Sequence, residues 1–188
     1  MTTTLDWRRN RDMWVRVLEK QTGEGVAAWN SRIRKHRFGD EKQLRTWLSE
    51  RNVTGYAQQL LVMERFGYPD FVLATAEELI EKQYADAPQL RALYDAIVKA
   101  ATGGGDVVVQ ARKTFVSLVS PRRTFARIQR AGKTRVNLGL RLDGQQPVGR
   151  LVRSNLHETM RLQIPLTTEA EVDAEVRRWL KRAYVENS

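Results

Sequence analysis

The spacing of apolar residues changes near residue 106, and this change constrains the fold more than any other feature of the sequence. Before that point apolar side chains recur every three to four residues, as they do along one face of an α-helix. After it they alternate with polar side chains, as they do along a half-buried β-strand. A helical part followed by a strand-rich part is typical of an α+β protein rather than of repeated βαβ units.

The first part, residues 1–70, is expected to form a domain of four amphipathic helices. The turn sequences Gln21-Thr22-Gly23 and Phe38-Gly39-Asp40 each end one helix. Asp40 followed by Gln43 is a capping box, which satisfies free amide groups at the start of the next helix. The apolar stripes of these helices carry three of the five tryptophans, which predict a small core: Trp14, Trp29 and Trp47.

Residues 40–51 and 54–66 also fit a second interpretation, the helix-turn-helix of DNA-binding proteins. The second helix would then begin with side chains that can read base edges, namely Thr54, Tyr56, Gln58 and Gln59. The alternative is a packed helical bundle in which the glutamines face water.

The second part, residues 71–188, is expected to form an α+β domain. Capping boxes and apolar stripes predict helices over about 75–83, 88–101 and 168–185, and alternation predicts strands between about 114 and 164. The strands would form an antiparallel sheet of four or five members, and helices 88–101 and 168–185 would cover its apolar face. The opposite face would be left to water or to a ligand.

Positive charge is concentrated in the predicted strands. The whole chain has a formal net charge of +10, and residues 106–165 alone hold twelve basic and three acidic side chains. Arginine, which can grip a phosphate with two parallel hydrogen bonds, supplies 24 of the 32 basic residues. This distribution favours an acidic partner, with nucleic acid, either DNA or RNA, as the first choice.

The predicted nucleic-acid-binding residues lie on one face of the sheet and on its adjoining turns. Arg127, Arg135, Arg141 and Arg161 fall opposite the apolar positions of their strands. Phe125 falls on the same side as Arg127 by simple alternation, and could stack on a base. The complete set of candidate residues is Lys113, Arg122, Arg123, Phe125, Arg127, Arg130, Lys133, Arg135, Arg141 and Arg161.

Two parts of the chain resemble bacterial domains of unknown function. MWVRVLEKQTGEGVAAWNSRIRK with WLSERNVTGYAQQLLV resembles a small helical domain. KTFVSLVSPRRTFARIQ, TRVNLGLRL and DAEVRRWLKRAY are similar to a second domain that is often found behind the first and is sometimes labelled a predicted transport protein. The resemblance implies a helical domain followed by an α+β domain, and supplies no catalytic residue. Relatives of the second domain occur beside restriction-type modules.

Signals for catalysis are poor, so a non-enzymatic protein without cofactor or metal is favoured. His36 and His157 lack metal-ligand spacing, there is no cysteine, and the glycines at 103–105 are not followed by the Lys-Ser/Thr of a phosphate loop. Two alternatives remain: an adaptor or oligomerisation module that docks an acidic protein, and an enzyme that acts on a small anionic substrate near His157 and Glu158. Without a secretion signal or a long apolar run, a cytoplasmic protein with no membrane partner is expected.

Overall fold

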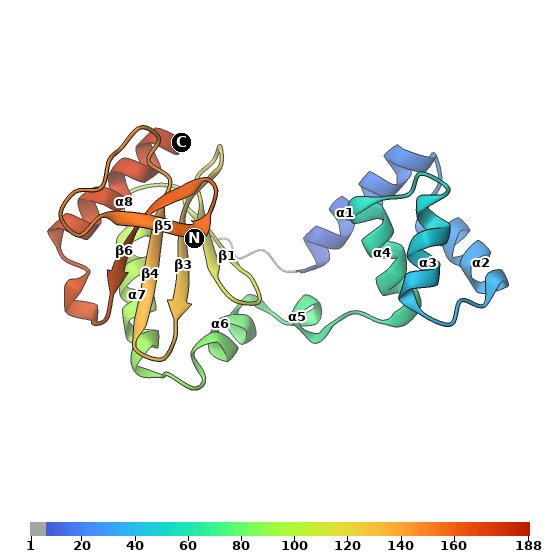
Figure 1. Ribbon diagram of the computed structural model, residues 1–188, viewed down its shortest axis with the longest axis horizontal. Coiled ribbons are helices and arrows are strands. Elements are labelled where there is room, and N and C mark those ends of the chain that lie inside the picture. Colours follow the sequence, from blue (N-terminus) through green and yellow to red (C-terminus); the bar gives the residue numbers. More distant parts are fainter. Residues whose placement is uncertain (1–6) are drawn as a thin grey trace. The chain divides into compact units, whose positions relative to one another are not determined.

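The computed structural model describes residues 7–188, which divide into two compact units. The first comprises residues 7–75 and is entirely helical, whereas the second comprises residues 76–188 and contains a β-sheet (Figure 1).

The helical unit is built around one nearly buried helix. Its elements are α1 (Trp7–Thr22), α2 (Val26–His36), α3 (Glu41–Ser49), α4 (Gly55–Phe66) and the short α5 (Asp70–Leu73). Five of the seven side chains from Ala57 to Met63 on α4 are buried, because α1, α2 and α3 all pack against this helix. Trp29 joins this core at 5% exposure, and Trp14 and Trp47 pack against its edge. The predicted cap at Asp40 is present, since its carboxylate accepts a hydrogen bond of 2.8 Å from the Gln43 amide.

The second unit is an α+β structure, as predicted. Two helices, α6 (Ala76–Tyr84) and α7 (Gln89–Thr102), precede the sheet, and α8 (Ala174–Asn187) follows it. The strands are β1 (Val108–Ala111), β2 (Val116–Val119), β3 (Thr124–Ala131), β4 (Arg135–Leu140), β5 (Val152–His157) and β6 (Met160–Leu166).

The sheet has six antiparallel strands in the order β1-β2-β3-β4-β6-β5, rather than four or five. The prediction missed β1, whose four residues are too few to establish an alternating pattern. The fifth strand of the chain, β5, pairs with β6 through an irregular register. Thus the strands of the sheet begin at Val108, earlier than the predicted residue 114.

Helices α7 and α8 cover one face of the sheet and contact each other (Figure 1). The apolar side chains of the central strands point into this interface: Leu138, Leu140 and Ile164 are fully buried. We call the opposite side, which neither helix covers, the open face.

The last helix begins later than residue 168. The predicted capping box of Thr168 and Glu171 exists, but it caps a single 3-10 turn, Glu169–Glu171. The backbone leaves helical geometry at Val172 (ψ 58°), and α8 starts only after Asp173, whose side chain accepts hydrogen bonds from the amides of Glu175 and Val176. A capping box satisfies only the first amide groups of a helix, so it does not determine whether the helix continues.

The hairpin of β5 and β6 bends over the open face. In Figure 1, β5 runs across the direction of β3 and β4. Gly139 on β4 makes this possible, because a Cβ atom at this position would lie 3.1 Å from Cδ1 of Leu156 on β5 and 3.5 Å from Cβ of Met160. The open face is therefore concave instead of flat.

Candidate arginine cavity

One polar row crosses the open face from β1 to β6. The strand register aligns Gln110 with Ser117, Ser117 with Arg127, Arg127 with Gly139 and Gly139 with Gln163. Arg135, Asn137 and Arg141 lie on the same side of β4, because residues two apart along a strand share a face. The open face therefore brings together arginines and amides from several strands.

The turn of the β5–β6 hairpin borders a cavity of about 520 Å³ over the β1–β3 part of this row. Four guanidinium groups and one imidazole line it, no carboxylate does, and we call it the arginine cavity. These charged or ionisable side chains are Arg112, Arg123, Arg127, Arg141 and His157. The lining also includes the Phe115 ring and the hydroxyl groups of Ser117, Thr124 and Thr159.

Arg127 is held at the base of the arginine cavity. Its guanidinium carbon lies 3.6 Å from the centre of the Phe115 ring, a cation–π contact. Its Nη1 donates a hydrogen bond of 3.1 Å to the backbone oxygen of Leu156 on the bent hairpin. Its Nε is buried without an acceptor. Burial lowers the pKa of Arg127 from its ordinary value, so here a charged group is desolvated without a carboxylate partner.

Arg123 and Arg141 resemble Arg127 in one respect: the Nε of each is buried and has no hydrogen-bond acceptor. The only carboxylate near Arg123 in the described structure is Asp143, which is largely exposed and 3.5 Å away. These three guanidiniums are thus partly desolvated while the lining of the cavity holds no carboxylate, and this favours an anion beside them.

A second hollow of about 710 Å³ adjoins the arginine cavity and shares Arg141 and Thr159 with it. It carries Arg153 and Arg161 but also two carboxylates, Asp143 and Glu158. The charge of this hollow is therefore mixed, whereas that of the arginine cavity is positive throughout.

Residues 80–187 match the family model of a domain of unknown function, DUF5655. The chain belongs to the DUF5655 family. No curated protein and no solved structure matches the chain. The matched residues include all the strands, α7 and α8, so the whole arginine cavity lies within the DUF5655 domain.

Phe125 of the DUF5655 domain does not lie on the open face, so its predicted role in stacking on a base is wrong. The register between β2 and β3 shifts at this point: Leu118 is opposite Ala126, but Val119 is opposite Thr124. Phe125 is the extra residue of a β-bulge, which interrupts the alternation of faces. Its ring is fully buried and meets the ring of Tyr184 on α8 edge-on, with 5.5 Å between centroids.

Arg130 and Lys133 are drawn away from the open face. Asp86, between α6 and α7, forms an ion pair with Arg130 and lies 3.7 Å from the Lys133 ammonium. Arg130 falls two residues after the inward Ile128, so it emerges on the side of the helices. Their grouping with the open-face arginines is therefore a correction to the predicted site.

The other predicted residues lie around the open face. Arg123, Arg127 and Arg141 line the arginine cavity, and Arg161 lines the adjoining hollow. The remaining three are exposed in a turn or at a strand end: Lys113, Arg122 and Arg135.

Sequence reasoning missed Arg112, Phe115 and Thr159 as members of the cavity. His157, which it named only for the alternative of an enzyme, also belongs to the cavity lining. The one available signal was Gly139, a residue without a side chain in the clearest alternating strand, which often marks a close approach of another backbone.

The helix-turn-helix interpretation of α3 and α4 is not supported. Gln58 Nε2 donates to the backbone oxygens of Arg45 and Val53, and Gln59 Oε1 accepts a bond of 3.0 Å from Arg45. These glutamines hold the corner between the two helices together, and five side chains of α4 are buried in the core. The packed-bundle alternative describes this unit better, although its glutamines bond to protein groups rather than to water.

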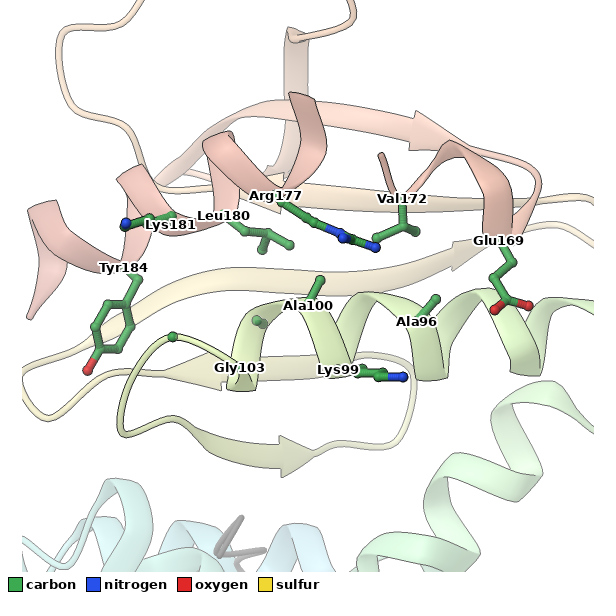
Figure 2. Close-up of a pocket in the computed structure, with 12 residues that line it drawn as sticks. Ala96, Lys99, Ala100, Gly103, Glu169, Val172, Arg177, Leu180, Lys181 and Tyr184 are labelled. Carbon is green, nitrogen blue, oxygen red and sulfur yellow. The ribbon is translucent and has the colours of Figure 1, made fainter. Parts of the chain in front are cut away.

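A further hollow of about 470 Å³ lies between α7 and α8 (Figure 2). Lys99, Arg177 and Lys181 project around it together with Glu169, and alanine, leucine and valine side chains form its floor. None of the predicted binding residues lines this hollow. No helix in residues 7–188 combines the length and the apolar character needed to cross a bilayer.

Proposed function

We propose that this protein binds nucleic acid through the phosphate backbone, using the arginines of the open face. The supporting observation is a group of four guanidiniums on one concave surface whose lining holds no carboxylate. Arginine matches the geometry of phosphate oxygens, and contacts to phosphate hold a nucleic acid without reading its sequence.

Electrostatic repulsion among the arginines favours such a ligand. Charges gathered on a surface with few counter-charges raise the local potential, and a polyanion relieves it. Arg130 and Lys133 are compensated by Asp86, but the arginine cavity has no carboxylate in its lining. The excess charge therefore lies on the open face rather than evenly over the surface.

Two side chains that could recognise bases are not accessible to a ligand. Phe125 is buried, and Asn137 is only 8% exposed. We therefore expect little discrimination among base sequences. We also propose that the protein is cytoplasmic and catalyses no reaction. We propose further that its helical unit is the small bacterial domain that residues 13–62 resemble. Transport is not part of it.

Binding of a mixed-sequence single strand, followed by fluorescence anisotropy, tests the proposal. Arg141→Glu with Arg161→Glu should weaken binding by about a hundredfold or more at low salt, because two contacts become repulsive. The matched control is Arg177→Glu with Arg178→Glu, which makes the same change of charge on exposed positions of α8.

The control pair should weaken binding by no more than about threefold, through long-range repulsion alone. Equal losses in the two double variants would show that net charge, rather than the open face, governs binding. No binding of DNA or RNA by the unmodified protein at micromolar concentration and low salt would refute the proposed function.

A further inference from the structure

The geometry points to the arginine cavity as a site for a phosphomonoester, the group found at a phosphorylated strand end and on a free nucleotide. This inference deepens the proposed function, on which it rests, by naming the part of the ligand that enters the cavity. The rest of the open face would contact the strand that follows the terminal phosphate.

The charge of the cavity favours a monoester over a backbone diester. A diester carries one negative charge, whereas a phosphomonoester carries about −1.5 to −2 near pH 7 and offers three acceptor oxygens. The cavity presents four guanidinium groups with no lining carboxylate, and three of them have a buried Nε without an acceptor. The four positive charges therefore attract the more highly charged group more strongly.

The cavity has room for a nucleotide-sized ligand, and one of its guanidiniums is held in place. Its volume of about 520 Å³ falls within the usual range of small-molecule sites, roughly 300–1,000 Å³. The Phe115 ring lies against one side of the Arg127 guanidinium, and the Leu156 carbonyl fixes one of its nitrogens. Arg127 is thus oriented before any ligand arrives, so little conformational freedom is lost on binding.

His157 supplies one more donor from the bent hairpin. Its Nδ1 accepts a hydrogen bond of 3.2 Å from the backbone amide of Thr159. In a neutral imidazole one nitrogen accepts and the other carries the proton, so Nε2 is then the donor. His157 lines the cavity, so its imidazole belongs to the same polar lining as the four guanidiniums. The imidazole and Arg127 come from strands that meet only because the hairpin bends over the sheet.

The test compares the affinity of the full chain for matched probes. These are one single strand of about ten nucleotides with a 5′-phosphate, a 3′-phosphate or two hydroxyl ends, a nucleoside monophosphate, and inorganic phosphate. A phosphate on one end should strengthen binding about tenfold or more, and the monophosphate should compete for the same site. Comparing the phosphorylated strands with the nucleoside monophosphate distinguishes a strand end from a free nucleotide as the source of the monoester.

Arg127→Gln should remove the preference for the phosphorylated end, yet leave the affinity for the hydroxyl-ended strand within about threefold. Arg178→Gln, on α8, is the matched control and should leave the preference unchanged. Thermal melting shows whether Arg127→Gln is folded. If it is not, Arg112→Gln, at an exposed position of the same lining, gives the same comparison.

Equal affinity for phosphorylated and hydroxyl-ended strands would overturn the phosphomonoester site while leaving the proposed function standing. Binding of the monophosphate without binding of any strand would overturn the proposed function and keep the site. Binding of no probe would overturn both.

Discussion

At the scale of single residues, Phe125 contributes to folding rather than to ligand binding, because its ring is fully buried against Tyr184. Phe125→Ala should lower the free energy of unfolding by about 3–5 kcal/mol, the usual cost of removing a buried aromatic ring. Urea denaturation, monitored by circular dichroism, measures this loss.

The control for this substitution is Phe115→Ala, which changes a ring that is only partly buried and lines the arginine cavity. It should cost less stability but release the guanidinium of Arg127 and weaken phosphate binding. The opposite pattern, in which Phe125→Ala loses binding and Phe115→Ala loses stability, would mean that Phe125 lies on the open face after all.

Glu64 makes the helical unit sensitive to acid. Burial raises the pKa of Glu64, but hydrogen bonds from Tyr68 and Arg11 outweigh it, and the pKa lies below its ordinary value. A carboxylate with a lowered pKa in the folded state contributes stability above its unfolded pKa. That contribution is lost as pH falls through the folded pKa.

The thermal unfolding midpoint of the helical unit should therefore decrease as the pH is lowered from about 7 to about 3. It should decrease less steeply in Glu64→Gln. Tryptophan fluorescence reports this unit, because four of the five tryptophans lie within its residues. Glu41→Gln, which removes the exposed partner of Arg45 on α3, is the control and should change the pH dependence little. Parallel pH profiles for the unmodified protein and Glu64→Gln would contradict this account.

At the scale of elements, the β5–β6 hairpin forms the arginine cavity because Gly139 lets it approach the sheet. Gly139→Val would place its Cβ 3.1 Å from Cδ1 of Leu156, closer than ordinary contact, so Leu156 must shift and the packing of the hairpin against β4 is disturbed. The substitution should destabilise the protein by about 1–3 kcal/mol. It should also lower the affinity for phosphate, as Arg127 loses its contact with the Leu156 carbonyl.

The control for the hairpin is Gly104→Val, since a Cβ at Gly104 meets nothing within 4 Å and its φ is not left-handed. Amide hydrogen exchange can then locate the change. Faster exchange confined to β5 and β6 in Gly139→Val is the expected result. Unchanged exchange together with unchanged phosphate affinity in Gly139→Val would show that the position of the hairpin does not affect the site.

The sequence predicted those elements whose period is regular and long. The alternation at 134–142 correctly places Arg135 and Arg141 opposite Leu138 and Leu140, because each strand residue alternates faces. It failed at Phe125, since a β-bulge inserts one residue without any local signal in the apolar pattern. It also failed for the cavity as a whole, because the bend of β5 depends on contacts with Gly139 that are distant in sequence.

At the scale of the whole molecule, the distribution of compensated and uncompensated charge determines how binding responds to salt. Six arginines line the arginine cavity or the adjoining hollow: Arg112, Arg123, Arg127, Arg141, Arg153 and Arg161. If each contacts one phosphate of a hydroxyl-ended single strand, the logarithm of the binding constant should fall against that of salt concentration with a slope of about −4. Anisotropy titrations between about 50 and 200 mM salt measure this slope.

Removing one charge then separates the open face from the rest of the protein. Arg161→Gln should make the slope less negative by about 0.7, since one counterion fewer is released. Arg130→Gln removes the same charge, but Asp86 already pairs with Arg130 on the side of the helices, so the slope should stay the same. A slope that changes equally in the two variants would mean that the bound strand responds to total charge. The separation of Arg130 from the open face would then have no consequence for binding.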